Sequence, residues 1–140
     1  MVDFKNIQVK TFIKNIKNND FLIKKNKEIK IVGSVFDSEP LLKSIYKTSE
    51  NKIFGKNFSA DLKVNFDKVI TGSNDDLSDF AIIGLINKGA FDKLSLKGKF
   101  SGNEILEISI YKIDNTKKTL QIISDRARPF IKSFDFIKGF

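Results

Sequence analysis

The sequence predicts a mainly β protein, built as an antiparallel meander of strands with two short helices. The first observation is that apolar and polar residues alternate with a period of two along most of the chain. The alternation is clearest in SADLKVNFDKV, residues 59–69, where Ala60, Leu62, Val64 and Phe66 fall on one side of an extended chain. The second observation is that short polar segments separate the alternating stretches, as hairpin turns do.

The expected strands follow from the alternation, and the polar segments between them are the expected turns. Residues 14–19, 87–93 and 101–103 are such segments, and each contains Gly, Asn or Asp. The expected strands cover residues 4–13, 20–26, 28–36, 58–70, 77–86, 94–100, 104–113 and 119–124.

Two stretches have the features of short helices. In residues 37–46, Asp37 stands at a capping position and Pro40 falls in a first turn. Residues 124–137 repeat this arrangement, with Pro129 in the first turns. The apolar residues expected to pack the second helix against the sheet are Phe130, Ile131 and Phe134.

Composition bounds the domain organisation and the chemistry. The 140 residues fit a single β-rich segment, residues 1–140, with room for a modest core. The chain has no histidine and no cysteine, which excludes the common zinc sites, Ser-His-Asp triads and Cys-His dyads. The cluster of Asp75, Asp76 and Asp79 lacks the spacing of a calcium loop and is expected to be a solvated turn. We therefore expect no enzyme activity, no metal site and no cofactor.

The net charge of +8 raises the question of an anionic partner. Residues 1–30 hold eight lysines against three acidic residues, an excess of five positive charges. Residues 31–140 hold the remaining excess of three positive charges. Lysines far outnumber arginines along the whole chain, a bias that genome composition can produce, so we expect no nucleic-acid partner. No window contains the about 18 to 20 apolar residues that a membrane-spanning helix needs.

The order of parts from Gly33 onward resembles the repeat region of a known family. GSVFDSEPLLKSI (33–45) and the long strand FSADLKVNFDKVITG (58–72) precede LSDFAIIGLINKGAFDKLSLKGKFSGN (77–103), and IISDRARPFIKSFDFIKGF (122–140) ends the chain. This order is similar to that of the AsmA-like envelope proteins of Gram-negative bacteria, particularly the YhdP-type branch, which is related to TamB. The residues of the last segment that match the family's strand-to-helix step are Asp125, Ala127, Phe130, Ile131, Phe134, Asp135, Ile137 and Gly139.

The resemblance implies a long, twisted β-sheet with an open apolar groove that shields phospholipid acyl chains without catalysis. It also implies a periplasmic location, as part of a longer protein held at the inner membrane by an anchor outside these residues. An acyl chain requires a continuous apolar strip and gains about 0.8 kcal/mol per buried methylene. The residues expected to line the groove are Leu62, Val64, Phe66, Leu94, Leu96, Phe100, Leu106, Ile108, Ile110, Leu120 and Ile122.

Alternatives of other classes remain open on pattern alone. The apolar faces of the strands could be buried against each other in a closed barrel or a sandwich. A small basic β-barrel would suit nucleic acid, and a sheet with a free edge would suit a module that recruits another protein by strand addition.

Overall fold

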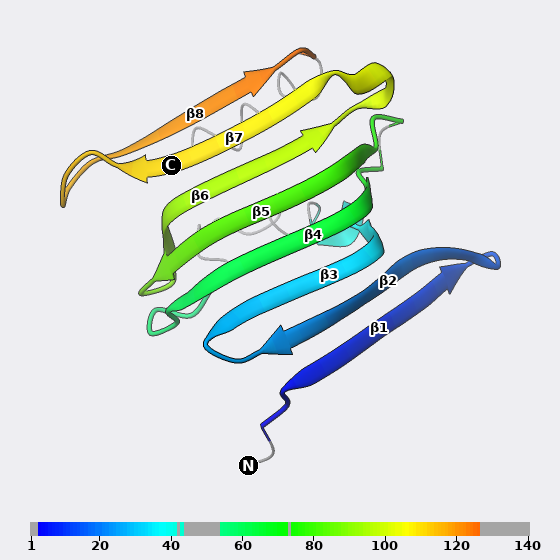
Figure 1. Ribbon diagram of the computed structural model, residues 1–140, viewed down its shortest axis with the longest axis horizontal. Coiled ribbons are helices and arrows are strands. Elements are labelled where there is room, and N and C mark those ends of the chain that lie inside the picture. Colours follow the sequence, from blue (N-terminus) through cyan, green and yellow to red (C-terminus); the bar gives the residue numbers. More distant parts are fainter. Residues whose placement is uncertain (1–2, 42, 44–53, 73, 127–140) are drawn as a thin grey trace.

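The computed structural model describes residues 3–41, 43, 54–72 and 74–126, and these form one eight-stranded sheet (Figure 1). The spatial order of the strands is their order in the chain. The strands are β1 (Asn6–Ile13), β2 (Ile16–Lys25), β3 (Glu28–Asp37), β4 (Ala60–Ile70), β5 (Leu77–Asn87), β6 (Ala90–Lys99), β7 (Ile105–Lys112) and β8 (Lys118–Ser124). The prediction of a mainly β, twisted meander is confirmed.

The sheet is open, since β1 and β8 are its two edges and do not pair with each other. The described strands therefore form neither of the closed alternatives, barrel or sandwich. Figure 1 shows the strands side by side in a single twisted layer.

One strand pair departs from the antiparallel prediction. β3 and β4 are parallel, with Ile31 opposite Val64, whereas every other neighbouring pair of described strands is antiparallel. A parallel pair needs a connection of about a dozen residues or more to bring the chain back to its starting edge. Residues 38–59 make this crossover, and alternation within each strand contains no information about that direction.

Two predicted turns are wrong in length. Residues 14–19 and 87–93 were expected to be turns, but β2 begins at Ile16 and β6 begins at Ala90. Only two residues connect each hairpin, and all four have positive φ: 47° and 62° at Lys14 and Asn15, 50° and 80° at Lys88 and Gly89. Positive φ at both central positions matches the twist of the flanking strands, so the hairpins close tightly and the strands begin earlier.

The helix predictions are only partly covered by the described residues. The first predicted helix, residues 37–46, is helical at residues 39–41 and 43, and Asp37 Oδ1 accepts a hydrogen bond from the Glu39 amide as a cap would. The second, residues 124–137, lies mostly outside the described residues, including Phe130, Ile131 and Phe134. Its first residue, Ser124, is the last residue of β8. A short 3-10 turn at Ser101–Asn103 links β6 to β7.

The core lies on one face of the middle strands. Val64, Phe66 and Val69 of β4 are buried together with Leu77, Phe100 and Leu106. Around Phe66, the rings of Phe21 and Phe36 complete an aromatic group, with ring centroids 5.6 and 5.2 Å from that of Phe66.

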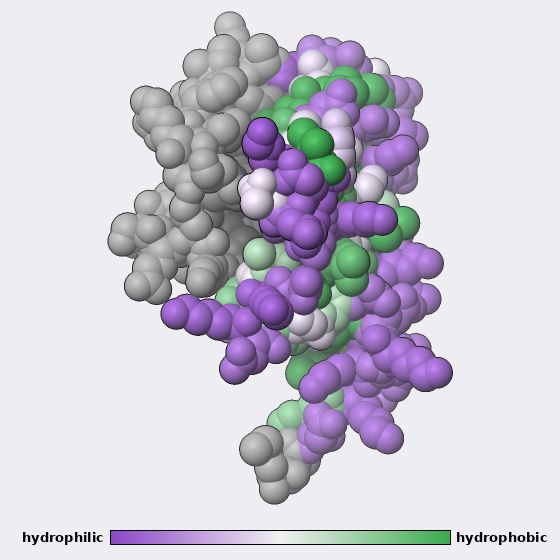
Figure 2. Space-filling model, turned by 90° about the vertical axis from the view of Figure 1, so that its left-hand side faces the viewer, coloured by the Kyte–Doolittle hydropathy of each residue, from purple (hydrophilic) through white to green (hydrophobic). Residues whose placement is uncertain are grey.

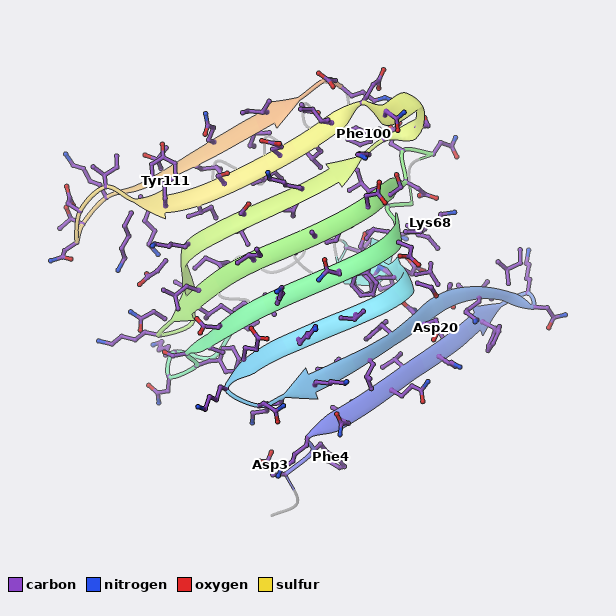
Figure 3. All side chains as sticks on the ribbon, viewed as in Figure 1. Asp3, Phe4, Asp20, Lys68, Phe100 and Tyr111 are labelled. Atoms are coloured by element: carbon purple, nitrogen blue, oxygen red, sulfur yellow. The ribbon has the colours of Figure 1, made fainter. Side chains whose placement is uncertain are left out.

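At this end of the sheet the two-residue alternation is interrupted in three neighbouring strands. Residues that contribute to the core are three positions apart instead of two, and Asp79, inside one of the intervals, has a φ of 48°. Figure 3 places Lys68 of β4 and Phe100 at this end. The core residues that show the interval are Phe66 and Val69 in β4, and Leu77 and Phe80 in β5. In β3 the positions paired with Phe66 and Val69 are Gly33 and Phe36, so the same interval recurs there.

Candidate functional site: an apolar face across the sheet

Strand register places apolar side chains in a single row that crosses the whole sheet. Residues directly opposite each other in neighbouring strands point to the same face, so the row can be followed from pair to pair. From β1 to β8 it consists of Ile7, Ile23, Ile31, Val64, Ile82, Leu96, Ile108 and Ile122.

A second row runs beside the first on the same face. From β3 to β8 it consists of Ile29, Leu62, Gly84, Leu94, Ile110 and Leu120. On the other side of the first row, Phe66 and Leu106 belong to the core together with Phe100. We call this surface, formed by the two rows and their core neighbours, the apolar face.

All eleven residues that the sequence proposed as groove lining lie on the apolar face. The register confirms that Leu62, Val64 and Phe66 point to the same side as Leu106, Ile108 and Ile110. Their exposure differs, however. Four of them are buried: Val64, Phe66, Phe100 and Leu106. The others are half-buried, except Leu120, which is 36% exposed.

Exposure along the first row is lowest in the middle and highest at the β1 edge. Val64 of β4 is 6% exposed, whereas Ile7 of β1 is 43% exposed. At the other edge, Leu120 of β8 is the most exposed member of the second row. A self-contained core would end in polar residues at the edge strands, but here the first row continues to both edges and the second row continues to the β8 edge.

Sequence reasoning missed four members of the row: Ile7, Ile23, Ile31 and Ile82. Each is apolar at an alternating position of its own strand, so the signal was present. What was missing was the register between strands, because a shift by one residue would have placed them on the other face.

A charged row borders the apolar face next to Leu94, Ile110 and Leu120. Lys112 Nζ lies 2.9 Å from Asp92 Oδ2, and Lys118 Nζ lies 3.6 Å from Asp92 Oδ1. The hydrogen bond from Lys112 is the main cause that holds the pKa of Asp92 below its usual range, and a hydrogen bond from Asn87 adds to it. This border of the apolar face thus has two cations, Lys112 and Lys118, and one anion, Asp92.

The acidic cluster predicted as a solvated turn is distributed over separate ion pairs. Asp75 pairs with Arg126, Asp76 with Lys68 and Asp79 with Lys99. Within the described part of the chain, no group of three or more acidic side chains is arranged to hold a metal ion. Among those same residues, no helix has the length and apolar content required to cross a membrane.

The opposite face of the sheet is mainly polar, since one row across it consists of Asn6, Lys24, Lys30, Lys63, Ile83, Ser95, Ser109 and Gln121. Figure 2 views the molecule from its side, where hydrophilic residues cover much of the described surface, with hydrophobic residues between them. Tyr111 of β7, labelled in Figure 3, is 44% exposed on this face, since its neighbour Ile110 points to the apolar face.

Comparison of the chain with protein-family models, with curated proteins and with solved structures gives no match. The resemblance to AsmA-like proteins therefore stays a prediction from the order and pattern of the sequence segments.

Proposed function

We propose that this chain is a lipid-conduit segment of an AsmA-like, YhdP-type envelope protein. In this function the segment lies on the periplasmic side of the inner membrane and shields phospholipid acyl chains between inner and outer membrane. The anchor to the inner membrane lies outside these residues. The observation that carries the proposal is the apolar row from Ile7 to Ile122, which extends to both edges of the sheet.

The physical reason is that an acyl chain requires length without hydrogen-bond partners. Eight strands, with neighbours about 4.8 Å apart, give an apolar row that is roughly 34 Å long. Contact with such a row stabilises a lipid by about 0.8 kcal/mol per methylene removed from water. No catalytic residue is involved, so the function is non-enzymatic and requires no cofactor.

The parts of the apolar face differ in solvent exposure, and we infer a different role for the buried and the accessible residues. Val64, Phe66 and Leu106 are buried and hold the sheet together. The half-buried Ile110 and the more exposed Leu120 offer accessible apolar surface on β7 and β8. We place the headgroup toward Lys112 and Lys118, with the acyl chain entering the apolar row from its accessible end on β6 to β8.

The test uses two neighbouring residues that point to opposite faces. A photo-crosslinking amino acid is introduced in cells at position 120, on the apolar face, and in a matched variant at position 121. Gln121 is exposed on the opposite face of the same strand, so the two variants share location, expression and local backbone.

We expect phospholipid adducts from position 120, and from position 122, but none from position 121. Equal labelling at positions 120 and 121, or no lipid adduct at any of them, would refute the conduit.

A second candidate is an interaction module that recruits a partner by strand addition. It is favoured by the two sheet edges, because neither β1 nor β8 has a second partner strand among the described residues. A proline at Lys10, in the middle of β1, would remove a backbone donor from the free edge, because Lys25 N–H donates to Lys5 O and alternate residues of β1, Lys10 among them, therefore point their N–H away from β2. Loss of a protein partner in this variant, with lipid crosslinking unchanged, would favour strand addition over the conduit.

A further inference from the structure

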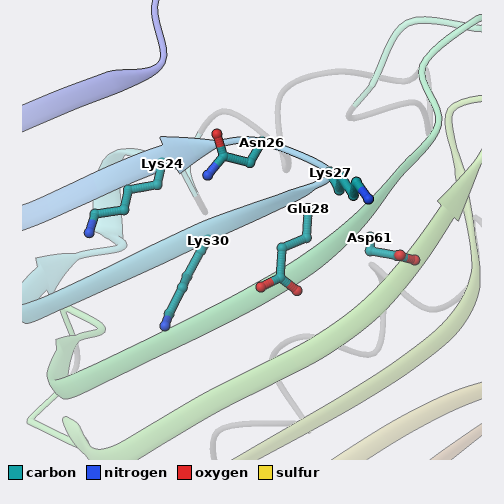
Figure 4. Close-up of a pocket in the computed structure, with 6 residues that line it drawn as sticks. All are labelled: Lys24, Asn26, Lys27, Glu28, Lys30 and Asp61. Carbon is teal, nitrogen blue, oxygen red and sulfur yellow. The ribbon is translucent and has the colours of Figure 1, made fainter.

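Three lysines from adjacent strands stand directly beside one another on the face opposite the apolar face. Lys24 of β2 is paired in register with Lys30 of β3, and Lys30 is paired with Lys63 of β4. We call this row the lysine ladder. Figure 4 shows Lys24 and Lys30 extending from neighbouring strands toward the same side.

The ladder lysines form no ion pair with the described part of the protein. None of the ion pairs between described residues includes Lys24, Lys30 or Lys63. Like charges in directly opposite positions of a sheet are destabilising. An external anion is therefore the partner that would relieve this repulsion.

The two sides of the ladder differ in character. On one side, the next positions of β3 and β4 carry Glu28 and Asp61, which repel an anion. On the other side, the ladder borders Leu22 and Val32, and these two side chains line a shallow hollow together with Lys24 and Lys30. An anion bound at the ladder is therefore favoured on the side of Leu22 and Val32, away from Glu28 and Asp61.

Exposed aliphatic side chains surround this approach. Val32 is 44% exposed and Ile83, the direct neighbour of Lys63 in β5, is 63% exposed. Neither the ladder's row nor the row of Val32 contains an aromatic residue in the described strands, so bases have no ring on which to stack. Lysines beside exposed aliphatic residues fit the surface of an anionic bilayer, whose phosphates lie next to its apolar interior.

We propose that β2 to β5 dock this face on a membrane that contains anionic phospholipid. Lipid phosphates contact the lysine ladder, and Val32 and Ile83 enter the headgroup region. This membrane contact uses the face opposite the proposed lipid strip and does not depend on it, so either proposal can fail alone.

The experiment measures binding of the full chain to sedimented vesicles. One set is phosphatidylcholine alone, and the other contains about one third phosphatidylglycerol, so that only the second has a negative surface potential. The ladder variant is Lys24→Gln/Lys30→Gln/Lys63→Gln. The matched control is Lys5→Gln/Lys56→Gln/Lys117→Gln, three exposed lysines in other parts of the chain, so that each variant has a net charge of +8 − 3 = +5.

We expect the wild-type chain to bind the anionic vesicles and not the neutral ones. The ladder variant should lose affinity on the order of 100-fold, because each lysine at the surface contributes about fivefold. The control should lose far less. Ile83→Ser should weaken vesicle binding while leaving binding to heparin, a soluble polyanion, unchanged.

Three results would overturn the proposal. The first is absence of wild-type binding to anionic vesicles, and the second is an equal loss in the ladder and control variants, which would indicate net charge alone. The third is displacement of the chain from vesicles by single-stranded oligonucleotide at lower concentration than by anionic lipid, which would indicate a nucleic-acid surface. Melting curves check that all variants fold.

Discussion

Arg126, which follows β8, forms an ion pair with Asp75 in the loop between β4 and β5, with Nη1 2.7 Å from Oδ1. The same guanidinium pairs with Glu104 and lies over the ring of Phe100, 5.4 Å from its centroid. One side chain therefore joins three segments that are distant in the sequence.

This geometry predicts a graded effect of substitutions at position 126. Arg126→Ala should lower the melting temperature, because Asp75 and Glu104 lose a common partner. Arg126→Lys should recover only part of the loss, since a single ammonium cannot contact both carboxylates as a planar guanidinium does. Thermal unfolding followed by circular dichroism measures this, and identical curves for the three proteins would contradict it.

The exposure profile of the apolar face predicts a strong contrast between its centre and its edge. Val64→Asp should reduce the free energy of unfolding by roughly 3 kcal/mol or more, because a carboxylate would be buried without a partner. Leu120→Asp should cost less than about 1 kcal/mol, because its carboxylate can stay hydrated at the β8 edge. Urea unfolding of both variants gives the comparison, and similar losses would show that the edge is as enclosed as the centre.

Two glycines of the sheet predict opposite outcomes for the same substitution. A Cβ at Gly33 would lie 2.2 Å from the Asp20 carbonyl oxygen, whereas a Cβ at Gly98 would meet its nearest neighbour, in Leu77, at 3.5 Å. Gly33→Ala should therefore destabilise the protein by about 1–3 kcal/mol, as overpacking does. Gly98→Ala is the control and should be neutral or slightly stabilising in the same urea titration. A neutral Gly33→Ala would mean that β2 and β3 approach less closely than described.

The Asp92 ion pairs predict how stability depends on pH. The pKa of Asp92 is lowered in the folded state by Lys112, so the folded protein holds the charged form more strongly than the unfolded chain does. This contribution is complete above the ordinary aspartate pKa of about 3.9 and is lost as the pH falls through the lowered value. Asp92→Asn should reduce stability at neutral pH and flatten its decline in acid. An unchanged acid profile would show that Asp92 is not linked to folding.

The alternation of the sequence by itself determined the strands and which residues of each strand belong together. It placed Leu62, Val64 and Phe66 on one side because successive side chains in a strand point to opposite faces. It also identified the boundaries of most strands to within a few residues, since turn residues interrupt the alternation. The low helix content among the described residues follows from the same pattern.

Only the tertiary structure decided how the strands lie beside one another. The parallel pairing of Ile31 with Val64 could not be predicted, because the alternation is the same for either strand direction. Register then created the two features on which the proposals rest: the continuous apolar row and the lysine ladder. Both consist of residues from strands whose relative position is fixed by backbone hydrogen bonds and turn geometry, and no local sequence pattern encodes that position.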